Sequence, residues 1–513
     1  MESTSGTPQG QHDDVADADP NAVPGSFRRT IGKMAAASAF ALVLGQAISL
    51  AQTIAVARLL SPSVVGVFVA GTVITSFLAN LVEGGIRSAL IQRDHDLEDA
   101  AETVFYATLA TGILLSLGTL ASAPIIGLVF HSHTAALVAA ATSGILLIYS
   151  LVNVPEAFLQ REFSIARRII VGPLIALSNA VVAVTGAALG WGVWALVAGM
   201  YASFVSWVIG VWWISDWRPG RGRPSFRLWR EMARYGFPLV LGFVGTRIHD
   251  IFESVTIGRW LGSAALGTYR YSQRVAQIPV MAIIEIGAVA LFPVFSRIAD
   301  NTDRFRTAYL NGIRFGVVGA APMSGLMFAL GQPSVTVVFG EPWRAAGSTV
   351  MAMAGVGVGK ALICVSEEAI KASGRTRLLN WITLTEVVSG VGFLLLLIGP
   401  YGLVGAGLAI SLAATCIAVV SVWLARPVVG VRLRDVATAA FPPLPGMVAA
   451  TAACWALEHL VFHSDERAIP VAIALLLVDV AVFGVIYLAG LSLVSRDLVA
   501  ELFGLVRRKL ARS

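Results

Sequence analysis

Fourteen long apolar runs, joined mostly by short connections, fill most of this 513-residue sequence. A helix needs about 20 mostly apolar residues to cross the hydrocarbon core of a bilayer. Only 13% of the residues are charged, whereas soluble domains carry about a quarter. The pattern therefore predicts an all-α polytopic membrane protein with 14 transmembrane helices and excludes an ordinary soluble enzyme. The predicted spans are residues 34–57, 63–86, 102–130, 135–158, 169–189, 192–215, 236–258, 263–293, 307–330, 346–370, 378–399, 402–425, 438–460 and 468–491.

The connections between the predicted spans are alternately rich and poor in basic residues. Most of the 37 Lys and Arg residues fall in every second connection, including a six-arginine loop between residues 218 and 234. Cytoplasmic loops of membrane proteins are enriched in Lys and Arg, so both termini are predicted to be cytoplasmic. The net charge of +6 then reflects orientation and contact with anionic membrane lipids rather than nucleic acid. The opposite connections hold only Arg58, Arg259, Arg344 and Arg467.

An internal repeat relates the two halves of the chain. Arg58 and Gly66, after the first span, recur at the same spacing as Arg259 and Gly267, after the seventh. A shift of six spans preserves membrane orientation, so the halves are predicted to be parallel repeats related by an axis along the membrane normal. Transporters built from such repeats bind substrate between the halves and rock one half against the other. The repeat therefore favours a transporter.

A second match supports this division of the chain. Gly192 and Gly402 lie in equivalent tight turns, after the fifth and the eleventh spans. The sequence thus predicts two six-helix lobes followed by two extra helices. The predicted units are a disordered acidic cytoplasmic tail (1–30), an N-terminal lobe with a basic inter-lobe loop (31–235), a C-terminal lobe (236–437), spans 13 and 14 (438–491) and a basic cytoplasmic tail (492–513).

Several segments resemble a known family. They are Arg58-Leu-Leu-Ser-Pro-Ser-Val-Val-Gly66, the stretches 83–93 and 192–199, and the runs 257–262 and 292–297. Together they resemble the polysaccharide transporter family of Wzx-like flippases for lipid-linked oligosaccharides, over about residues 30 to 430. This family belongs to the multidrug/oligosaccharidyl-lipid/polysaccharide exporter superfamily.

The resemblance implies a function. We expect a bacterial inner-membrane flippase that moves an undecaprenyl-pyrophosphate-linked oligosaccharide to the outer leaflet by alternating access, for biosynthesis of exopolysaccharide or lipopolysaccharide. Its partners would be the lipid-linked glycan, a proton or sodium ion, membrane lipids, and the glycan polymerase and glycosyltransferases of the same pathway. The resemblance does not identify the glycan.

Charged residues inside the predicted spans point to a binding site, because such residues are costly at membrane depth and usually face a cavity or one another. All the basic ones lie in the second half. Guanidinium groups bind phosphate through two parallel hydrogen bonds, so these side chains are predicted to bind the pyrophosphate and sugar hydroxyls. They are Arg247, Arg270, Arg274, Arg314 and Lys360.

Four carboxylates in the same spans are predicted to couple transport to a proton or a sodium ion, since a carboxyl group in an apolar cavity can exchange protons near neutral pH. They are Asp250, Glu253, Glu285 and Glu386. The alternative is that these charges form structural pairs that hold helix to helix, and that Arg270 and Arg314 extend to the membrane surface. The first half offers mainly neutral polar residues: Gln46, Gln52, Asn80, Asn153 and Asn179.

Other functions remain open alternatives. An ion-coupled multidrug extruder of the same superfamily would be expected to have an acidic residue in its first span, and residues 34–57 contain none. A membrane-bound polymerase or glycosyltransferase would need a large loop or catalytic domain. We therefore expect no enzyme, no catalytic residue, no metal and no cofactor. The cysteines Cys364, Cys416 and Cys454 show no metal-binding spacing.

Overall fold

The computed structural model describes residues 25–83, 85–162, 167–498, 500 and 504. The described residues form helices and connections without a strand, which confirms the all-helical class. The predicted tail 1–30 falls mostly outside this part, and α1 begins at Gly25. The basic tail 492–513 is described only in part.

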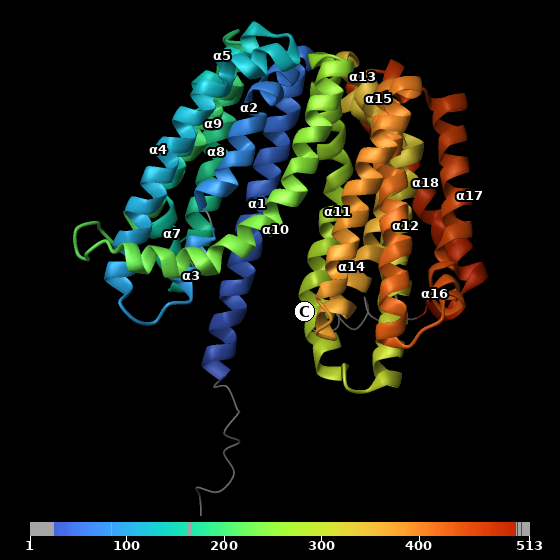
Figure 1. Ribbon diagram of the computed structural model, residues 1–513. Coiled ribbons are helices and arrows are strands. Elements are labelled where there is room, and N and C mark those ends of the chain that lie inside the picture. Colours follow the sequence, from blue (N-terminus) through green and yellow to red (C-terminus); the bar gives the residue numbers. More distant parts are fainter. Residues whose placement is uncertain (1–24, 84, 163–166, 499, 501–503, 505–513) are drawn as a thin grey trace, which may run out of the picture.

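The first half of the chain forms a group of helices on the left of Figure 1. These helices are rich in apolar residues and are joined by short connections. The elements are α1 (Gly25–Leu59), α2 (Pro62–Glu83), α3 (Ile86–Ile91), α4 (Leu97–Phe130), α5 (His133–Thr142), α6 (Gly144–Ser150), α7 (Asn153–Arg161), the π-helix η1 (Arg167–Val171), α8 (Gly172–Ala188) and α9 (Val193–Ile214).

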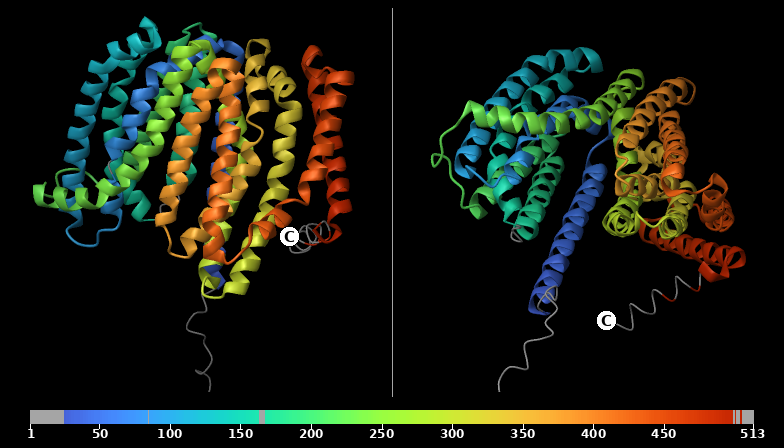
Figure 2. Two further views of the ribbon diagram at one scale, coloured as in Figure 1. Left: turned by 45° about the vertical axis from the view of Figure 1, so that its right-hand side comes forward. Right: turned by 60° about the horizontal axis from the view of Figure 1, so that its bottom comes forward.

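The second half forms the other group, on the right of Figure 1, except that the first part of α10 (Phe226–Trp260) lies across the end of the first group, in contact with α3 and α4. Figure 2 shows the same two groups from two further directions. The elements are α10 (Phe226–Trp260), α11 (Ser263–Ile298), α12 (Thr302–Phe339), the 3-10 turn η2 (Glu341–Trp343), α13 (Arg344–Ala352), α14 (Val356–Ala372), α15 (Arg377–Val429), α16 (Leu433–Ala440), α17 (Pro443–Leu457), the π-helix η3 (Glu458–Phe462), the 3-10 turn η4 (Ser464–Glu466) and α18 (Ile469–Val494).

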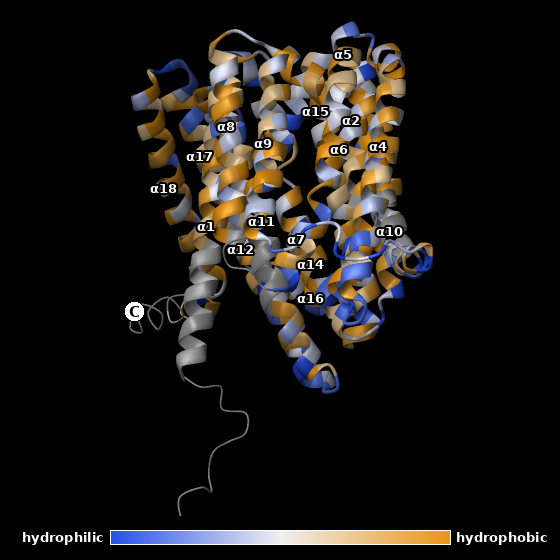
Figure 3. Ribbon diagram, turned by 90° about the vertical axis from the view of Figure 1, so that its left-hand side faces the viewer, coloured by the Kyte–Doolittle hydropathy of each residue, from blue (hydrophilic) through white to orange (hydrophobic). Residues whose placement is uncertain are grey.

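Ten helices of the described part are long and apolar enough to cross a membrane, or up to eleven if the bent pair Glu341–Ala352 and Val356–Ala372 forms one span. Predicted spans seven and eight fall on α10 and α11, which are not among the ten. Spans eleven and twelve fall on the single element α15, which is kinked at Gly402. The number fourteen therefore stays a prediction. Figure 3 shows hydrophobic residues along the helices and hydrophilic residues gathered toward their ends.

The two repeat-related turns have the same backbone conformation. Gly192 has φ 56° and ψ −127°, and Gly402 has φ 54° and ψ −129°. Side chains with a Cβ avoid this region, whereas glycine adopts it readily. Each glycine therefore reverses the chain between two long helices at equivalent places in the two halves.

The same repeat builds the contact between the lobes. Gly66 on α2 packs against the backbone of Ser263, and Gly267 on α11 packs against the backbone of Pro62, so that a Cβ at either glycine would overlap a carbonyl oxygen. The two helices can approach this closely because both positions lack a side chain. The Arg–Gly spacing that the two halves share is therefore explained by helix packing.

Arginines flank this crossing symmetrically. Arg58 donates to the carbonyl oxygen of Val338, near the end of α12, at 2.8 Å. Arg259 donates to the carbonyl oxygen of Val129, near the end of α4, at 3.3 Å. Each repeat arginine therefore reaches the other lobe and satisfies backbone groups at a helix end. The lobes meet at this face, beside α5 and α13, and diverge toward the face where α1 begins (Figure 1).

Candidate functional site

A polar cavity of about 620 Å³ lies in the N-terminal lobe. It is lined by α1 and α8, by the ends of α7 and η1, and by α9. The polar lining is mostly neutral: Gln46, Ser49, Gln52, Asn179 and Ser203, with the indole of Trp207. Amide and hydroxyl groups of this kind can both donate and accept hydrogen bonds, which suits a ligand rich in hydroxyl groups.

One hydrogen bond joins two helices of the cavity wall. Gln52 on α1 donates through Nε2 to Asn179 Oδ1 on α8 at 2.7 Å. This contact orients the remaining donor and acceptor groups of both amides. The sequence placed Gln46 and Gln52 on the first predicted span and Asn179 on the fifth, and the structure brings all three to one cavity.

Glu156 also lines this cavity and was not anticipated. Glu156 is 2% exposed. Its carboxylate accepts hydrogen bonds from Gln160 Nε2 at 3.3 Å and from Trp207 Nε1 at 3.5 Å. The sequence could have identified Glu156, because an acidic residue inside an apolar span marks a functional site by default. Asn153, predicted only as a polar residue of this span, is buried one turn earlier with no hydrogen-bond partner for its amide among the described residues.

Arg274 connects the C-terminal lobe to this cavity. From α11 it donates to the carbonyl oxygen of Ser49 at 3.2 Å and also to the Ser49 hydroxyl. Ser49 itself lines the cavity. Of the predicted cations whose side chains are described, Arg274 is the one with a hydrogen bond into the N-terminal lobe. It therefore places a positive charge at the rim of a polar cavity.

Glu253 and Arg270 share a second polar cluster, between α10 and α11. Glu253 is 6% exposed and accepts hydrogen bonds from the Tyr269 hydroxyl and from Gln273 Nε2 at 3.0 Å. Arg270 donates to Gln273 Oε1 at 3.2 Å. The structure thus joins a predicted coupling carboxylate to a predicted substrate-binding cation through one glutamine.

Lys360 and Glu386 form an ion pair, with Lys360 Nζ 3.7 Å from Glu386 Oε1. This pair joins α14 to α15 and matches the structural-pair alternative. Arg314 lies elsewhere, where it donates to the Ser495 hydroxyl at 2.8 Å and so connects α12 to the end of α18. The structure does not bring Arg314 to the polar cavity.

The remaining predicted residues lie on the long charged helices. The side chains of Arg247 and Glu285 lie outside the described part of the structure. Asp250, on α10, is half-buried, and its carbonyl oxygen accepts a hydrogen bond from Ser254. Its neighbour His249 packs on Gly390, one turn beyond Glu386. Among the described residues, His, Cys, Asp and Glu side chains form no group of three or more that could hold a metal ion.

Two lobes of apolar helices that cross at a repeated glycine pair, with a polar cavity in the N-terminal lobe, have the architecture of a polytopic membrane transporter. The family of polysaccharide biosynthesis proteins matches residues 55–348. The chain belongs to this family, and the resemblance to Wzx-like polysaccharide flippases is confirmed. It is a multi-pass protein of the bacterial inner membrane, while the orientation of its termini stays a prediction.

One relative by sequence and two solved structures are similar to this chain. The succinoglycan biosynthesis transport protein ExoT of Rhizobium meliloti (strain 1021) is 26% identical over 470 residues, which cover 89% of this chain and 92% of the relative. The fold is similar to that of the lipid II flippase MurJ in an inward closed conformation, with a TM-score of 0.72 and 14% identity over 90% of this chain and 99% of the other. An inward-facing multidrug resistance MATE family transporter has a TM-score of 0.63 and 19% identity over 77% of this chain and 98% of the other.

Proposed function

We propose that this protein moves an undecaprenyl-pyrophosphate-linked oligosaccharide across the membrane by alternating access, between the enzymes that assemble the glycan and those that polymerise it. The observation that carries the proposal is Arg274 at the rim of the polar cavity. Its guanidinium group has the charge and shape to bind a pyrophosphate. The amides and hydroxyls behind it have the chemistry to bind sugar hydroxyl groups.

An apolar groove offers room for the lipid part. It has a volume of about 900 Å³ and lies between α12, α14, α15 and α17. Its lining includes Phe328, Leu362, Val419 and Leu444. A prenyl chain that moves from the bilayer into this groove would exchange lipid contacts for side-chain contacts, so its binding would depend on packing rather than on removal from water. The groove therefore supports a lipid-linked substrate over a free oligosaccharide.

Transport would draw on an ion gradient through the predicted carboxylates. Glu253 is the best placed of them, because it is buried within reach of Arg270 through Gln273. A change in its protonation would alter the polar cluster between α10 and α11. Asp250 lies on the same helix, three residues before Glu253, and would act with it.

The second candidate function is an ion-coupled multidrug extruder, and Glu156 favours it. A buried carboxylate in the wall of the N-terminal cavity is suited to binding a cationic ligand. The two functions differ in the molecule that accumulates when the protein is missing: a lipid-linked glycan in the first case and a cationic drug in the second.

The experiment is complementation of a deletion strain, with lipid-linked intermediates and surface polysaccharide measured together. Wild type should clear the intermediate, whereas Arg274→Ala should lower export by about tenfold or more, since hydrogen bonds to charged groups contribute about 1.5–3 kcal/mol. The matched control is Arg297→Ala, at the exposed end of the same helix, which should export normally. Normal export by Arg274→Ala at equal protein level would refute the assignment, and absence of any lipid-linked intermediate in the deletion strain would favour the extruder.

A further inference from the structure

Two buried carboxyl groups face each other outside the site described above. Glu458 begins η3, directly after α17, and is 2% exposed; Asp479 lies in α18 and is 0% exposed. Both residues fall inside predicted spans, 438–460 and 468–491. Charged groups at such positions are costly unless they are paired or neutralised.

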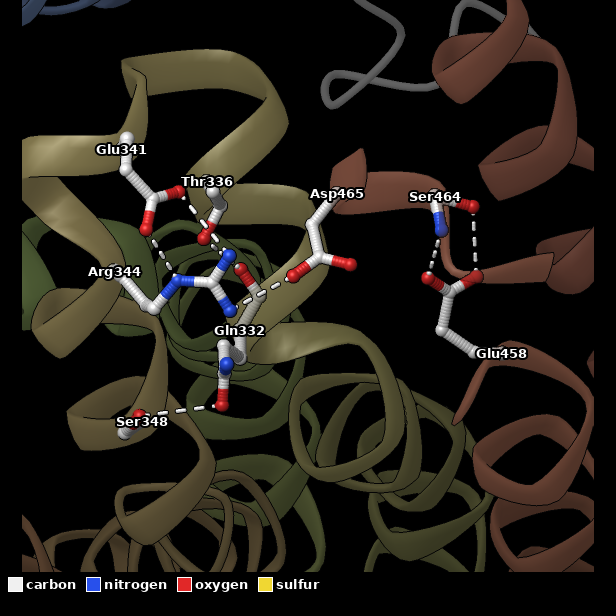
Figure 4. A network of polar contacts seen from close by, with 8 residues as sticks. All are labelled: Gln332, Thr336, Glu341, Arg344, Ser348, Glu458, Ser464 and Asp465. Carbon is white, nitrogen blue, oxygen red and sulfur yellow. Dashed lines mark hydrogen bonds and ion pairs between the residues drawn. The ribbon is translucent and has the colours of Figure 1, made fainter. Parts of the chain in front are cut away.

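Glu458 accepts two hydrogen bonds from Ser464. Its Oε1 accepts a hydrogen bond from the backbone N–H of Ser464 at 2.7 Å, and its Oε2 accepts one from the Ser464 hydroxyl at 2.8 Å. Figure 4 shows both bonds beside the network of Arg344. These two donors stabilise Glu458 as a carboxylate.

Asp479 differs from Glu458. Among the described residues, neither of its carboxyl oxygens has a hydrogen-bond donor. The groups that interact with it are the Glu458 carboxyl and the Cys454 thiol, and the thiol also donates to the Asp479 backbone oxygen, with Cys454 Sγ 3.8 Å from that oxygen. An ionised Asp479 would thus be buried beside another carboxylate, with the weakly donating Cys454 thiol as its stabilising group among the described residues.

The surrounding elements supply no cation to Asp479. Residues 315–339 of α12 contain no ionisable side chain. On η4, Asp465 is paired with Arg344 Nη1 at 2.9 Å, and Glu466 is exposed. On η3, His459 stacks on Trp455 with ring centroids 4.8 Å apart. Among the described residues of this region, both arginines are engaged elsewhere: Arg344 by Asp465 and Glu341, and Arg467 by the Phe462 carbonyl oxygen, to which its Nε donates at 3.3 Å.

We propose that Glu458 and Asp479 form a proton-binding site in the C-terminal helix pair. One proton resides on Asp479 and is donated in a hydrogen bond to the Glu458 carboxylate, so that the pair carries a single negative charge. When the proton leaves to water, two adjacent carboxylates remain, and their repulsion in an apolar setting separates η3 from α18.

This site lies against the wall of the apolar groove. Thr451 and Trp455 line the groove from α17, and Glu458 follows Trp455 by one helical turn. Separation of η3 from α18 would move these residues. Where the groove holds the lipid chain, a step that rests on the proposed function, proton occupancy would adjust its width. The proton site itself does not depend on that step.

The test is infrared spectroscopy of the purified full-length protein in lipid vesicles at neutral pH. Wild type should show the C=O band of a buried, protonated carboxyl group, and Asp479→Asn should lack it. Glu458→Gln should lose it too, because the new amide donates to Asp479 and lets it ionise. The matched control Glu386→Gln should keep the band. Identical spectra of wild type and Asp479→Asn would overturn the proposal.

A measurement on the wild-type protein keeps the proposal testable if the variants do not fold. Dicyclohexylcarbodiimide is an apolar reagent that modifies protonated carboxyl groups. Peptide mapping by mass spectrometry should find the adduct on Asp479 at neutral pH, with less of it as the pH rises. An unmodified Asp479 at neutral pH, in a sample where other buried carboxyl groups are labelled, would contradict a resident proton.

Discussion

Two buried carboxylates of this protein, Glu253 and Glu458, are held by specific donors. Glu253 has a tyrosine hydroxyl and a glutamine amide, and Glu458 has a serine hydroxyl and a backbone N–H. Leaving such a donor unpaired costs about 1–3 kcal/mol. The stability of the bundle therefore depends on these acids even where transport does not.

Glu253 provides the first prediction. Glu253→Ala leaves the Tyr269 hydroxyl and the Gln273 amide without their acceptor and should lower the free energy of unfolding by about 2–4 kcal/mol. Glu253→Gln keeps an oxygen acceptor and should lose less. Thermal unfolding of the purified protein in detergent measures both. Equal melting temperatures for wild type and Glu253→Ala would show that the cluster is not stabilising.

Sequence reasoning found part of this residue pattern. It singled out Glu253 and Arg274, because both lie in the middle of apolar runs. It did not single out Glu156 or Glu458, although both fall inside predicted spans. Nor could it show that Arg274 reaches Ser49, since that contact joins residues far apart in the chain and depends on the packing of two lobes.

Helix crossings are the features that matter at the scale of elements. The contact of α2 with α11 depends on Gly66 and Gly267, which the repeat had identified by spacing alone. The sequence predicted that the positions are equivalent. Their role in packing became visible only when both glycines were found against the opposite backbone.

The second prediction concerns this crossing. A methyl group at Gly66 would overlap the Ser263 carbonyl, so Gly66→Ala should push α2 from α11 and destabilise the protein by about 1–3 kcal/mol. Gly118→Ala, on α4, is the matched control, because no atom outside its own helix lies within 4 Å of a Cβ there. Thermal unfolding should separate the two variants; if they melt alike, the close crossing is wrong.

The third prediction concerns the start of α16, outside the predicted spans. The backbone N–H of Arg432 and the guanidinium of Arg306 lower the pKa of Asp435 below its ordinary value. The stabilisation is therefore present above the ordinary carboxyl pKa and is lost as the pH falls through the lowered one. Asp435→Asn should melt below wild type at neutral pH, and the difference should vanish in acid. Glu466→Gln, at an exposed carboxylate, should show no such pH-dependent difference, and a constant gap for Asp435→Asn would contradict the account.

Topology gives the fourth prediction, at the scale of the whole molecule. The alternation of basic residues along the chain predicts that both termini lie in the cytoplasm. A phosphatase reporter fused after Ser513 should remain inactive, whereas one inserted beside Arg467 should be exported and active. Export of the terminal reporter would reverse the predicted orientation.

The whole molecule also shows where sequence reasoning reaches its limit. Apolar runs predicted helices, because each run must satisfy its backbone polar groups internally in the membrane, and the internal repeat predicted two lobes. They did not predict that one predicted span would break into α5, α6 and α7, or that two others would be joined in α15 across Gly402. Such breaks depend on single glycine and polar positions and on packing partners from distant parts of the chain.

The proposed alternating access requires the two lobes to rock against each other, and we expect the Gly66–Gly267 crossing, where their backbones are in close contact, to be the pivot. The most direct measurement is the distance between spin labels in vesicles, on a cysteine-free background. One pair, Ser63→Cys with Ala264→Cys, lies at the crossing, and a second pair, Glu98→Cys with Asp300→Cys, lies at the opposite end of the lobes. If the lobes rock about this crossing, adding Gly66→Ala should lengthen the distance between the labels at the crossing and shorten the distance between the labels at the opposite end. Distances that stay fixed, or that lengthen at both ends, would contradict alternating access by rocking lobes.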